Sequence, residues 1–252
     1  MSEFQGKTAI VTGGSSGIGR ATVRLLAEKG AHVVIADINE RDGQTLVDQI
    51  GPDRALFIKT DVTNPAEVER LVSVAVARFG SLDYAVNAAG MVGPVVPLVE
   101  YSTATWEKIV NVNLTSVFLC LKAEIAQMQS QGTGGAIVNV SSALGLVGLG
   151  NVAGYTATKH AVAGLTKDVA LEVGKYGIRV NGVAPGSTRT PMYVEFSGGT
   201  EEVEKALIAS NHPIGRIAEP EDLARAIVAL LGDAFGFTIG TVLPVDGGWT
   251  IQ

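Results

Sequence analysis

The chain has 252 residues, of which 46% are hydrophobic and 17% charged, so it can bury a large α/β core. No unbroken apolar stretch approaches the length of a membrane helix, and the net charge of −6 without a basic run disfavours nucleic acid as a partner. A single cysteine excludes an internal disulfide, the three scattered histidines predict no metal site, and no export leader is seen, so we expect a cytoplasmic protein.

Short β-branched runs alternate with longer helical patterns along the whole chain. Several of the predicted strands are almost wholly apolar, as expected when helices cover both faces of a sheet. The alternation predicts an α/β fold with a doubly wound parallel sheet of about seven strands. The predicted strands cover residues 7–11, 31–37, 55–59, 84–87, 136–141, 179–183 and 241–244, and the predicted helices residues 17–29, 41–50, 65–79, 104–128, 155–176 and 220–231.

A glycine-rich segment, residues 12–19, connects the first predicted strand to the first predicted helix. Glycine permits a tight turn and a close approach of backbone to a ligand, and a helix N-terminus offers free N–H groups to a pyrophosphate. An ordinary strand–helix turn could use the same glycines, but the position after the first strand favours a dinucleotide site. The predicted contacts are Gly13, Ser15, Ser16, Gly17, Ile18 and Gly19.

Asp37 ends the second predicted strand, eighteen residues beyond Gly19. A carboxylate there can accept hydrogen bonds from the adenosine ribose hydroxyls and would repel a 2′-phosphate. The pattern therefore favours NAD over NADP. Two alternatives stay open: Asp37 could cap the next helix with Asn39, and nearby Arg41 could accommodate NADP.

Tyr155 and Lys159 are four residues apart in a predicted helix and so share one face. Tyrosine has a pKa near 10, and an adjacent ammonium favours the phenolate, so the pair predicts a lysine that lowers the pKa of a proton-transferring tyrosine. Such pairs also occur on solvated helix faces. The neighbouring His160 is interpreted as a packing residue.

Together these motifs resemble the short-chain dehydrogenase/reductase family over essentially the whole length. The resemblance rests on the glycine pattern of residues 12–19, on residues 87–90, where Ala88 replaces the second asparagine of the family motif, and on the ending 246–248. It implies a single Rossmann-type domain over residues 1–252, with a substrate loop at about 187–215. Further implied cofactor contacts are Asp61, Val62, Asn87, Ala89, Gly90, Tyr155, Lys159, Pro185, Gly186, Thr188 and Thr190.

The same resemblance implies a catalytic tetrad of Asn113, Ser142, Tyr155 and Lys159. Tyr155 would exchange a proton with the substrate oxygen, Ser142 would position that oxygen, and Asn113 would hold a water on the proton path. Ser142 lies thirteen residues before Tyr155, which is the family spacing, and is preferred over neighbouring Ser141. The family also implies a homotetramer, in which residues 104–128 and 155–176 form one interface.

Three mainly apolar segments follow strand ends that should border the nicotinamide: residues 91–96, 144–149 and 192–196. They carry no cluster of basic side chains, which favours a hydrophobic secondary alcohol, cyclic ones included, over a phosphorylated substrate. Alternatively, these side chains pack a lid against the core. The predicted substrate contacts are Val92, Val95, Ser142, Leu144, Tyr155, Met192, Tyr193 and Phe196.

The predicted function is therefore an NAD-dependent dehydrogenase of secondary alcohols. An NADP-dependent ketone or 3-oxoacyl reductase of the same family is the main alternative. A non-catalytic dinucleotide-binding regulatory protein is a further one, although Tyr155, Lys159 and Ser142 are all present.

Overall fold

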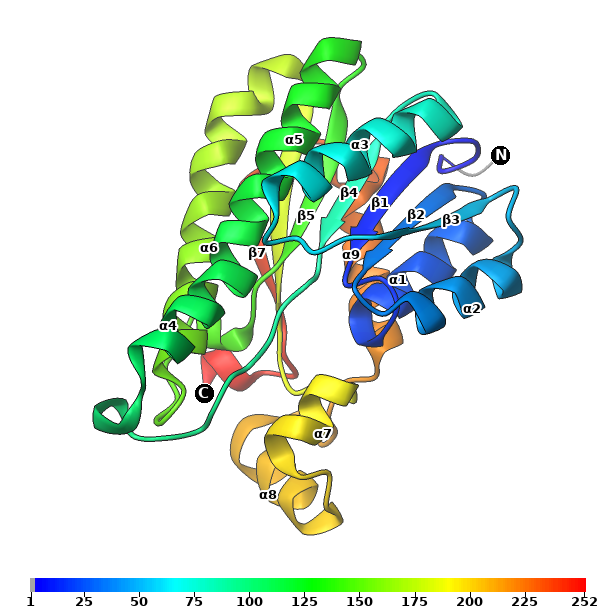
Figure 1. The fold of residues 1–252 in the computed structure, drawn as a ribbon. Helices are drawn as coiled ribbons and strands as arrows, with labels where there is room; N and C mark the ends of the chain where they lie inside the picture. Colours follow the sequence, from blue (N-terminus) through cyan, green and yellow to red (C-terminus); the bar gives the residue numbers. More distant parts are fainter. Residues whose placement is uncertain (1–2) are drawn as a thin grey trace.

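A seven-stranded, entirely parallel sheet forms the centre of the computed structural model, which describes residues 3–252 (Figure 1). The strand order is β3-β2-β1-β4-β5-β6-β7. The strands are β1 (Thr8–Thr12), β2 (His32–Asp37), β3 (Ala55–Lys59), β4 (Tyr84–Asn87), β5 (Gly135–Val140), β6 (Ile178–Pro185) and β7 (Val242–Val245). This Rossmann-type sheet confirms the predicted fold class, and every predicted strand is present within one or two residues of its predicted ends.

Helices cover both faces of the sheet, and each face has its own apolar core. On one face lie α1 (Gly17–Glu28), α2 (Glu40–Ile50) and α9 (Pro220–Leu231); on the other lie α3 (Pro65–Phe79), α5 (Ser116–Gln131) and α6 (Ala153–Val173). Successive strand residues point to opposite faces, so Ala9 and Val11 enter the first core and Ile10 the second. Burial on both faces explains why several of the strands are almost wholly apolar.

A single long helical segment replaces the predicted helix at 104–128. It consists of α4 (Thr103–Val110), a π-helical turn η2 (Asn111–Thr115) and α5. By length and mean hydropathy the helical stretch Thr103–Gln131 is long and apolar enough to cross a membrane. It is not an unbroken apolar run, however, because Asn111, Lys122 and Glu124 interrupt it. Val117, Leu121 and Met128 of this segment belong to the core under the sheet, and core helices are apolar for that reason.

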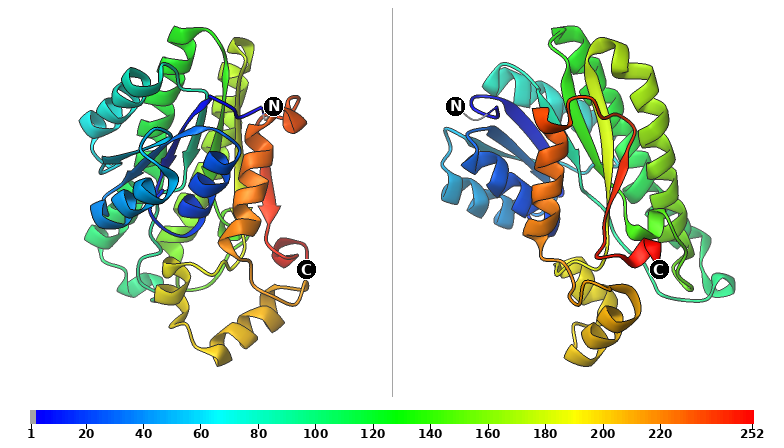
Figure 2. Two further views of the ribbon diagram at one scale, coloured as in Figure 1. Left: turned by 90° about the vertical axis from the view of Figure 1, so that its right-hand side faces the viewer. Right: turned by 180° about the vertical axis from the view of Figure 1, so that it is seen from behind.

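Two helices that the sequence analysis did not predict, α7 (Pro191–Ser197) and α8 (Glu201–Asn211), lie beyond the carboxyl ends of the strands (Figures 1 and 2). Each begins at a threonine whose hydroxyl caps its first turn, Thr190 or Thr200. The two glycines between them, Gly198 and Gly199, have φ values of 72° and 65°. A bridge between Thr188 and Ala218 ties the two ends of this excursion together.

Short 3₁₀ turns complete the chain. They are η1 (Leu98–Glu100), η3 (Ala143–Gly145), η4 (Gly174–Tyr176), η5 (Asp233–Phe235) and η6 (Trp249–Ile251).

A buried polar network joins the sheet to α5 and α6. The Asn87 amide donates to Glu124 Oε2 at 3.1 Å and to Asn139 Oδ1 at 3.0 Å, and the Asn139 amide donates to Thr166 Oγ1 at 3.0 Å. Glu124 is 1% exposed, and burial raises its pKa to about 7, although the bond from Asn87 opposes the rise. The network fixes the carboxyl ends of β4 and β5 relative to each other.

The Glu124→Gln variant should gain stability relative to the wild type as the pH rises. The folded-state pKa of Glu124 is above the ordinary value of 4.5, so the stability that the protonated form contributes is fully present below pH 4.5 and is lost as the pH rises through about 7. Glutamine cannot ionise, so the difference in unfolding free energy should change by on the order of 3 kcal/mol between pH 5 and pH 8.

Urea denaturation of both proteins at these two pH values measures that change. Glu172→Gln on the exposed surface of α6 is the matched control and should show no such trend. A pH-independent difference for Glu124→Gln would contradict the assignment of Glu124 as a buried titrating group.

Candidate active site

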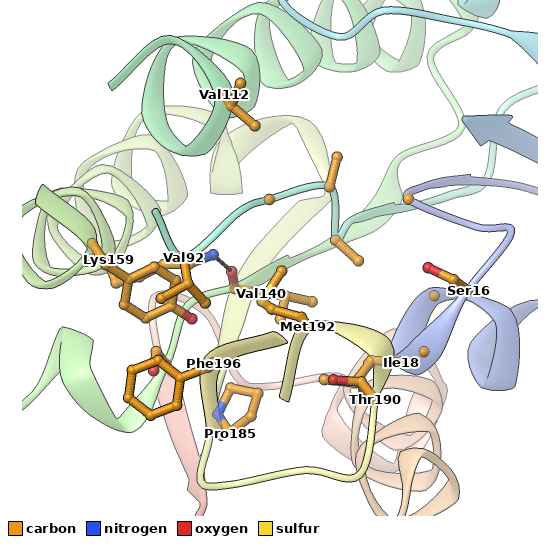
Figure 3. Close-up of a pocket in the computed structure, with 18 of the residues that line it drawn as sticks. Ser16, Ile18, Val92, Val112, Val140, Lys159, Pro185, Thr190, Met192 and Phe196 are labelled. Atoms are coloured by element: carbon orange, nitrogen blue, oxygen red, sulfur yellow. Dashed lines mark hydrogen bonds between the residues drawn. The ribbon is translucent and has the colours of Figure 1, made fainter. Parts of the chain in front are cut away.

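A cavity of about 830 Å³ opens at the carboxyl ends of the strands, where parallel α/β sheets bind their ligands. Figure 3 shows its two ends: Ser16 and Ile18 of the glycine-rich turn lie at one, and Lys159, Val92 and Phe196 at the other. Its size suits a dinucleotide together with a small substrate.

The glycine-rich turn presents backbone to the cavity. Gly13 and Gly17 have φ values of 63° and 48°, and a Cβ on Gly19 would overlap the carbonyl of Gly13. Ser16 is the N-cap of α1, but its hydroxyl makes no capping bond, and the first turn carries no acidic residue. The N–H groups of this helix end are therefore open to an anion, which fits a pyrophosphate.

Ser15 does not line the cavity. It is 2% exposed, and its N–H donates to Asp37 Oδ2 at 3.1 Å. Ser15 thus orients the carboxylate of Asp37, which does line the cavity.

Asp37 lies at the far end of the cavity from Lys159, at the end of β2. Its Oδ1 accepts the Asn39 N–H at 3.0 Å, but the N-cap of α2 is Asn39 itself, whose side chain accepts the Asp42 N–H. The Arg41 side chain is directed to Asp42 at 3.3 Å and is not part of the cavity lining. The basic side chains that line the cavity are Lys108 and Lys159.

Ser142, Tyr155 and Lys159 all line the other end of the cavity. Ser142 follows β5 and caps η3, its Oγ accepting the Leu144 N–H at 3.1 Å. Lys159 Nζ donates to the Val140 carbonyl at 2.8 Å and lies 5.6 Å from the centre of the Tyr155 ring (Figure 3). The structure thus brings together three of the four predicted catalytic side chains.

Burial, not the lysine, dominates the acidity of Tyr155. Desolvation raises the pKa of the phenol above its ordinary value of 10, and the hydrogen bond with Ser142 lowers it by less. The same desolvation lowers the pKa of Lys159 to about 8, because the ammonium sits in the same water-poor wall. The predicted lowering of the Tyr155 pKa by Lys159 is therefore not seen in the protein alone, where the pKa of Tyr155 is raised.

The neighbouring Ser141 is bound elsewhere. Its hydroxyl donates to the Lys159 carbonyl at 2.8 Å and so anchors α6 to the end of β5. This leaves the Ser142 hydroxyl, as the chain spacing predicts, as the serine that faces Tyr155.

Asn113 lies in the π-turn and is fully buried outside the cavity lining. Its side-chain oxygen accepts the Met91 N–H at 2.8 Å, and its amide donates to the Met91 carbonyl at 2.8 Å and to Thr158 Oγ1 at 3.3 Å. These bonds hold the segment after β4 against α6. The side chain is thus committed to protein partners.

Most of the other predicted cofactor contacts do line the cavity. Asn87 is the exception besides Ser15, because its side chain belongs to the buried network with Glu124. Those that line the cavity are Asp61, Val62, Ala89, Gly90, Pro185, Gly186, Thr188 and Thr190.

The wall around Tyr155 is mainly apolar. Val95 is 50% exposed and lies outside the lining, because the loop after β4 turns away before it. The predicted contacts that line the wall are Val92, Leu144, Met192, Tyr193 and Phe196. Leu149, in the predicted apolar segment 144–149, also lines it, whereas Val152 and Trp249 were not predicted. Trp249 could have been found, because it follows the last strand and thus a ligand-facing strand end.

Comparison with known proteins agrees with this geometry. A family model described as enoyl-(acyl carrier protein) reductase matches residues 13–250. A 2,5-dichloro-2,5-cyclohexadiene-1,4-diol dehydrogenase of Sphingobium indicum is 45% identical, over 99% of each chain. A cis-4-hydroxycyclohexanecarboxylate dehydrogenase of Sinomonas cyclohexanicum is 46% identical, over 98% of each chain.

Among solved structures, levodione reductase superposes with a TM-score of 0.92 at 37% identity, covering 98% of this chain and 99% of that one. The matches span nearly the whole chain, including the residues that line the cavity. The chain therefore belongs to the short-chain dehydrogenase/reductase family and is an oxidoreductase that acts on alcohols or their ketones.

Proposed function

We propose that this protein is an NAD-dependent dehydrogenase that interconverts a hydrophobic cyclic secondary alcohol and its ketone. The observation that carries the proposal is the placement of Tyr155, Ser142 and Lys159 at an apolar end of the cavity. The names of two relatives support a cyclic substrate, since both denote dehydrogenases of substituted six-membered carbocycles.

Tyr155 is the proton-transfer group in this proposal. During oxidation of an alcohol its oxygen takes the hydroxyl proton, and during reduction it returns a proton to the carbonyl oxygen. The Ser142 hydroxyl binds the same substrate oxygen and also stabilises the tyrosine anion by its hydrogen bond. Lys159, held by the Val140 carbonyl, adds positive charge near the ring of Tyr155.

The residues at the other end of the cavity fit a nicotinamide dinucleotide, which supplies the hydride acceptor or donor when bound. The open N–H groups at the start of α1 suit its pyrophosphate, and Asp37 suits an unphosphorylated ribose. Arg41 is directed away from the cavity, which further favours NAD over NADP.

The assembly is proposed to be a homotetramer in the cytoplasm, as the family resemblance implies. Phe118 on α5 and Leu171 on α6 are 50% and 78% exposed, and such apolar side chains on the two helices support a contact between subunits there.

Replacing Tyr155 with Phe should reduce turnover of secondary alcohols by at least about 10²-fold, because the proton-transfer group is lost while the ring remains. Binding of NAD, followed by calorimetry, should change little. Tyr176→Phe, at a half-exposed tyrosine near the end of α6, is the control and should keep full activity. Retained turnover in Tyr155→Phe would refute the assignment.

Replacing Asp37 with Ala should narrow the preference for NAD over NADP by about tenfold or more, because the carboxylate that repels a 2′-phosphate is removed. The ratio of kcat/KM with the two cofactors measures this. Asp48→Ala on α2 serves as the control, since it removes a carboxylate outside the cavity lining. An unchanged ratio in Asp37→Ala would show that another group selects the cofactor.

Replacing Ser142 with Ala should shift the pH profile of alcohol oxidation to higher pH, besides lowering kcat by about 10²-fold. Oxidation needs Tyr155 without its proton, and the bond from Ser142 lowers the tyrosine pKa, so its loss raises that pKa further. The rate-limiting ionisation then occurs at higher pH. Ser142→Thr, which keeps a hydroxyl, should return the profile toward the wild type; a profile unmoved in Ser142→Ala would contradict the role.

A further inference from the structure

The last turn of the chain, η6, contributes a large aromatic side chain to the catalytic end of the cavity. Trp249 follows β7, the strand farthest from the dinucleotide end, whose binding residues follow β1 and β2. Ser142 follows β5 and Pro185 ends β6, so the order of the strands places Trp249 beyond both. Trp249 therefore lies on the substrate side of the cavity.

A buried histidine holds this turn in place. The His212 ring, 3% exposed at the end of α8, interacts through Nδ1 with the Asp246 carbonyl at 2.8 Å, and its Nε2 accepts the Ser187 N–H at 3.3 Å. The second contact assigns the proton to Nδ1, which donates to Asp246. The Trp249 ring packs edge-on against the imidazole, with 5.6 Å between ring centres and an interplanar angle of 84°.

The turn is also rigid within itself and joined to α8. The Asp246 carboxylate accepts the N–H groups of Gly248 at 3.0 Å and Thr250 at 2.9 Å. The Gly247 carbonyl accepts the Ile214 N–H at 3.1 Å, just beyond the end of α8. Trp249 is thus fixed to the same unit that carries α7, whose Met192 and Phe196 also line the cavity.

From this arrangement we propose that Trp249 is a specificity-determining residue that selects ring-shaped secondary alcohols over short open-chain ones. The inference rests on the proposed function and deepens it. A rigid indole presents a broad apolar surface at no further cost in side-chain ordering, and a six-membered ring covers more of it than a four-carbon chain does. His212 is a positioning residue that acts through Trp249.

The test compares cyclohexanol with 2-butanol as substrates. Trp249→Ala should lower the ratio of kcat/KM for cyclohexanol to that for 2-butanol by about 30-fold, the scale on which an apolar pocket discriminates by a few methylenes. The lower kcat/KM for cyclohexanol should result mainly from a higher KM, while the Kd for NAD stays unchanged. Trp249→Phe should recover most of the ratio, because an aromatic wall remains.

The chain offers a matched control, since its other tryptophan, Trp106, is on α4 and is not part of the cavity lining. Trp106→Ala should keep the wild-type ratio. If Trp249→Ala keeps it too, or lowers kcat/KM for both alcohols equally, the inference is overturned. An equal fall in kcat/KM for both alcohols would show that Trp249 has only a structural role.

A second readout separates this inference from the proposed function. In Trp106→Phe, Trp249 is the sole tryptophan, so adding cyclohexanone to the NAD complex should change the tryptophan fluorescence, whereas 2-butanone should change it far less. If the wild type oxidises neither alcohol, the proposed function fails and this binding signal still decides the role of Trp249. Equal responses to the two ketones would overturn that role.

Discussion

The hydrogen bond from Lys159 Nζ to the Val140 carbonyl, 2.8 Å long, is the contact on which the proposed catalytic end of the cavity depends. It fixes the first turns of α6 to the carboxyl end of β5, and the Ser141 hydroxyl reinforces it from the strand side. The geometry places Tyr155, on α6, opposite Ser142, which follows β5. Burial disfavours the charged form of Lys159. The hydrogen bond to the backbone carbonyl of Val140 offsets part of this cost, so the ammonium can remain in the buried wall.

Burial of this wall has two opposite effects on the chemistry. It makes the Tyr155 phenol harder to ionise. In the proposed reaction it would also strengthen every interaction that stabilises charge on the substrate oxygen. The hydrogen bond from Ser142 works against the first effect and contributes to the second. The two ends of the cavity differ in chemistry. At one end, backbone N–H groups and Asp37 suit a dinucleotide, whereas the end near Tyr155 is mainly apolar.

The strands, most of the helices and the site residues at strand ends could be predicted from the sequence, because apolar periodicity and turn residues mark them. The strands at 55–59 and 84–87 were predicted with their observed bounds, because both are apolar runs between clear turn signals. The helices α7 and α8 were missed, since α7 has only seven residues and α8 has no buried residue that would give an apolar periodicity. The roles of Ser15 and Asn87 could be seen only in the structure. Neither lines the cavity: Ser15 hydrogen-bonds Asp37, and Asn87 hydrogen-bonds the buried Glu124. Trp249 was overlooked although it follows a strand end; only its contact with His212, which is distant in sequence, needed coordinates.

A crystal structure of the ternary complex with NAD and cyclohexanone tests the central claim most directly. We predict a ketone oxygen within about 2.6–3.2 Å of both the Tyr155 and the Ser142 hydroxyl oxygens, with the ring of the ketone against the apolar wall. A ketone oxygen bound to other groups, with the Tyr155 hydroxyl directed away from it, would contradict the assignment of Tyr155 as the proton-transfer group.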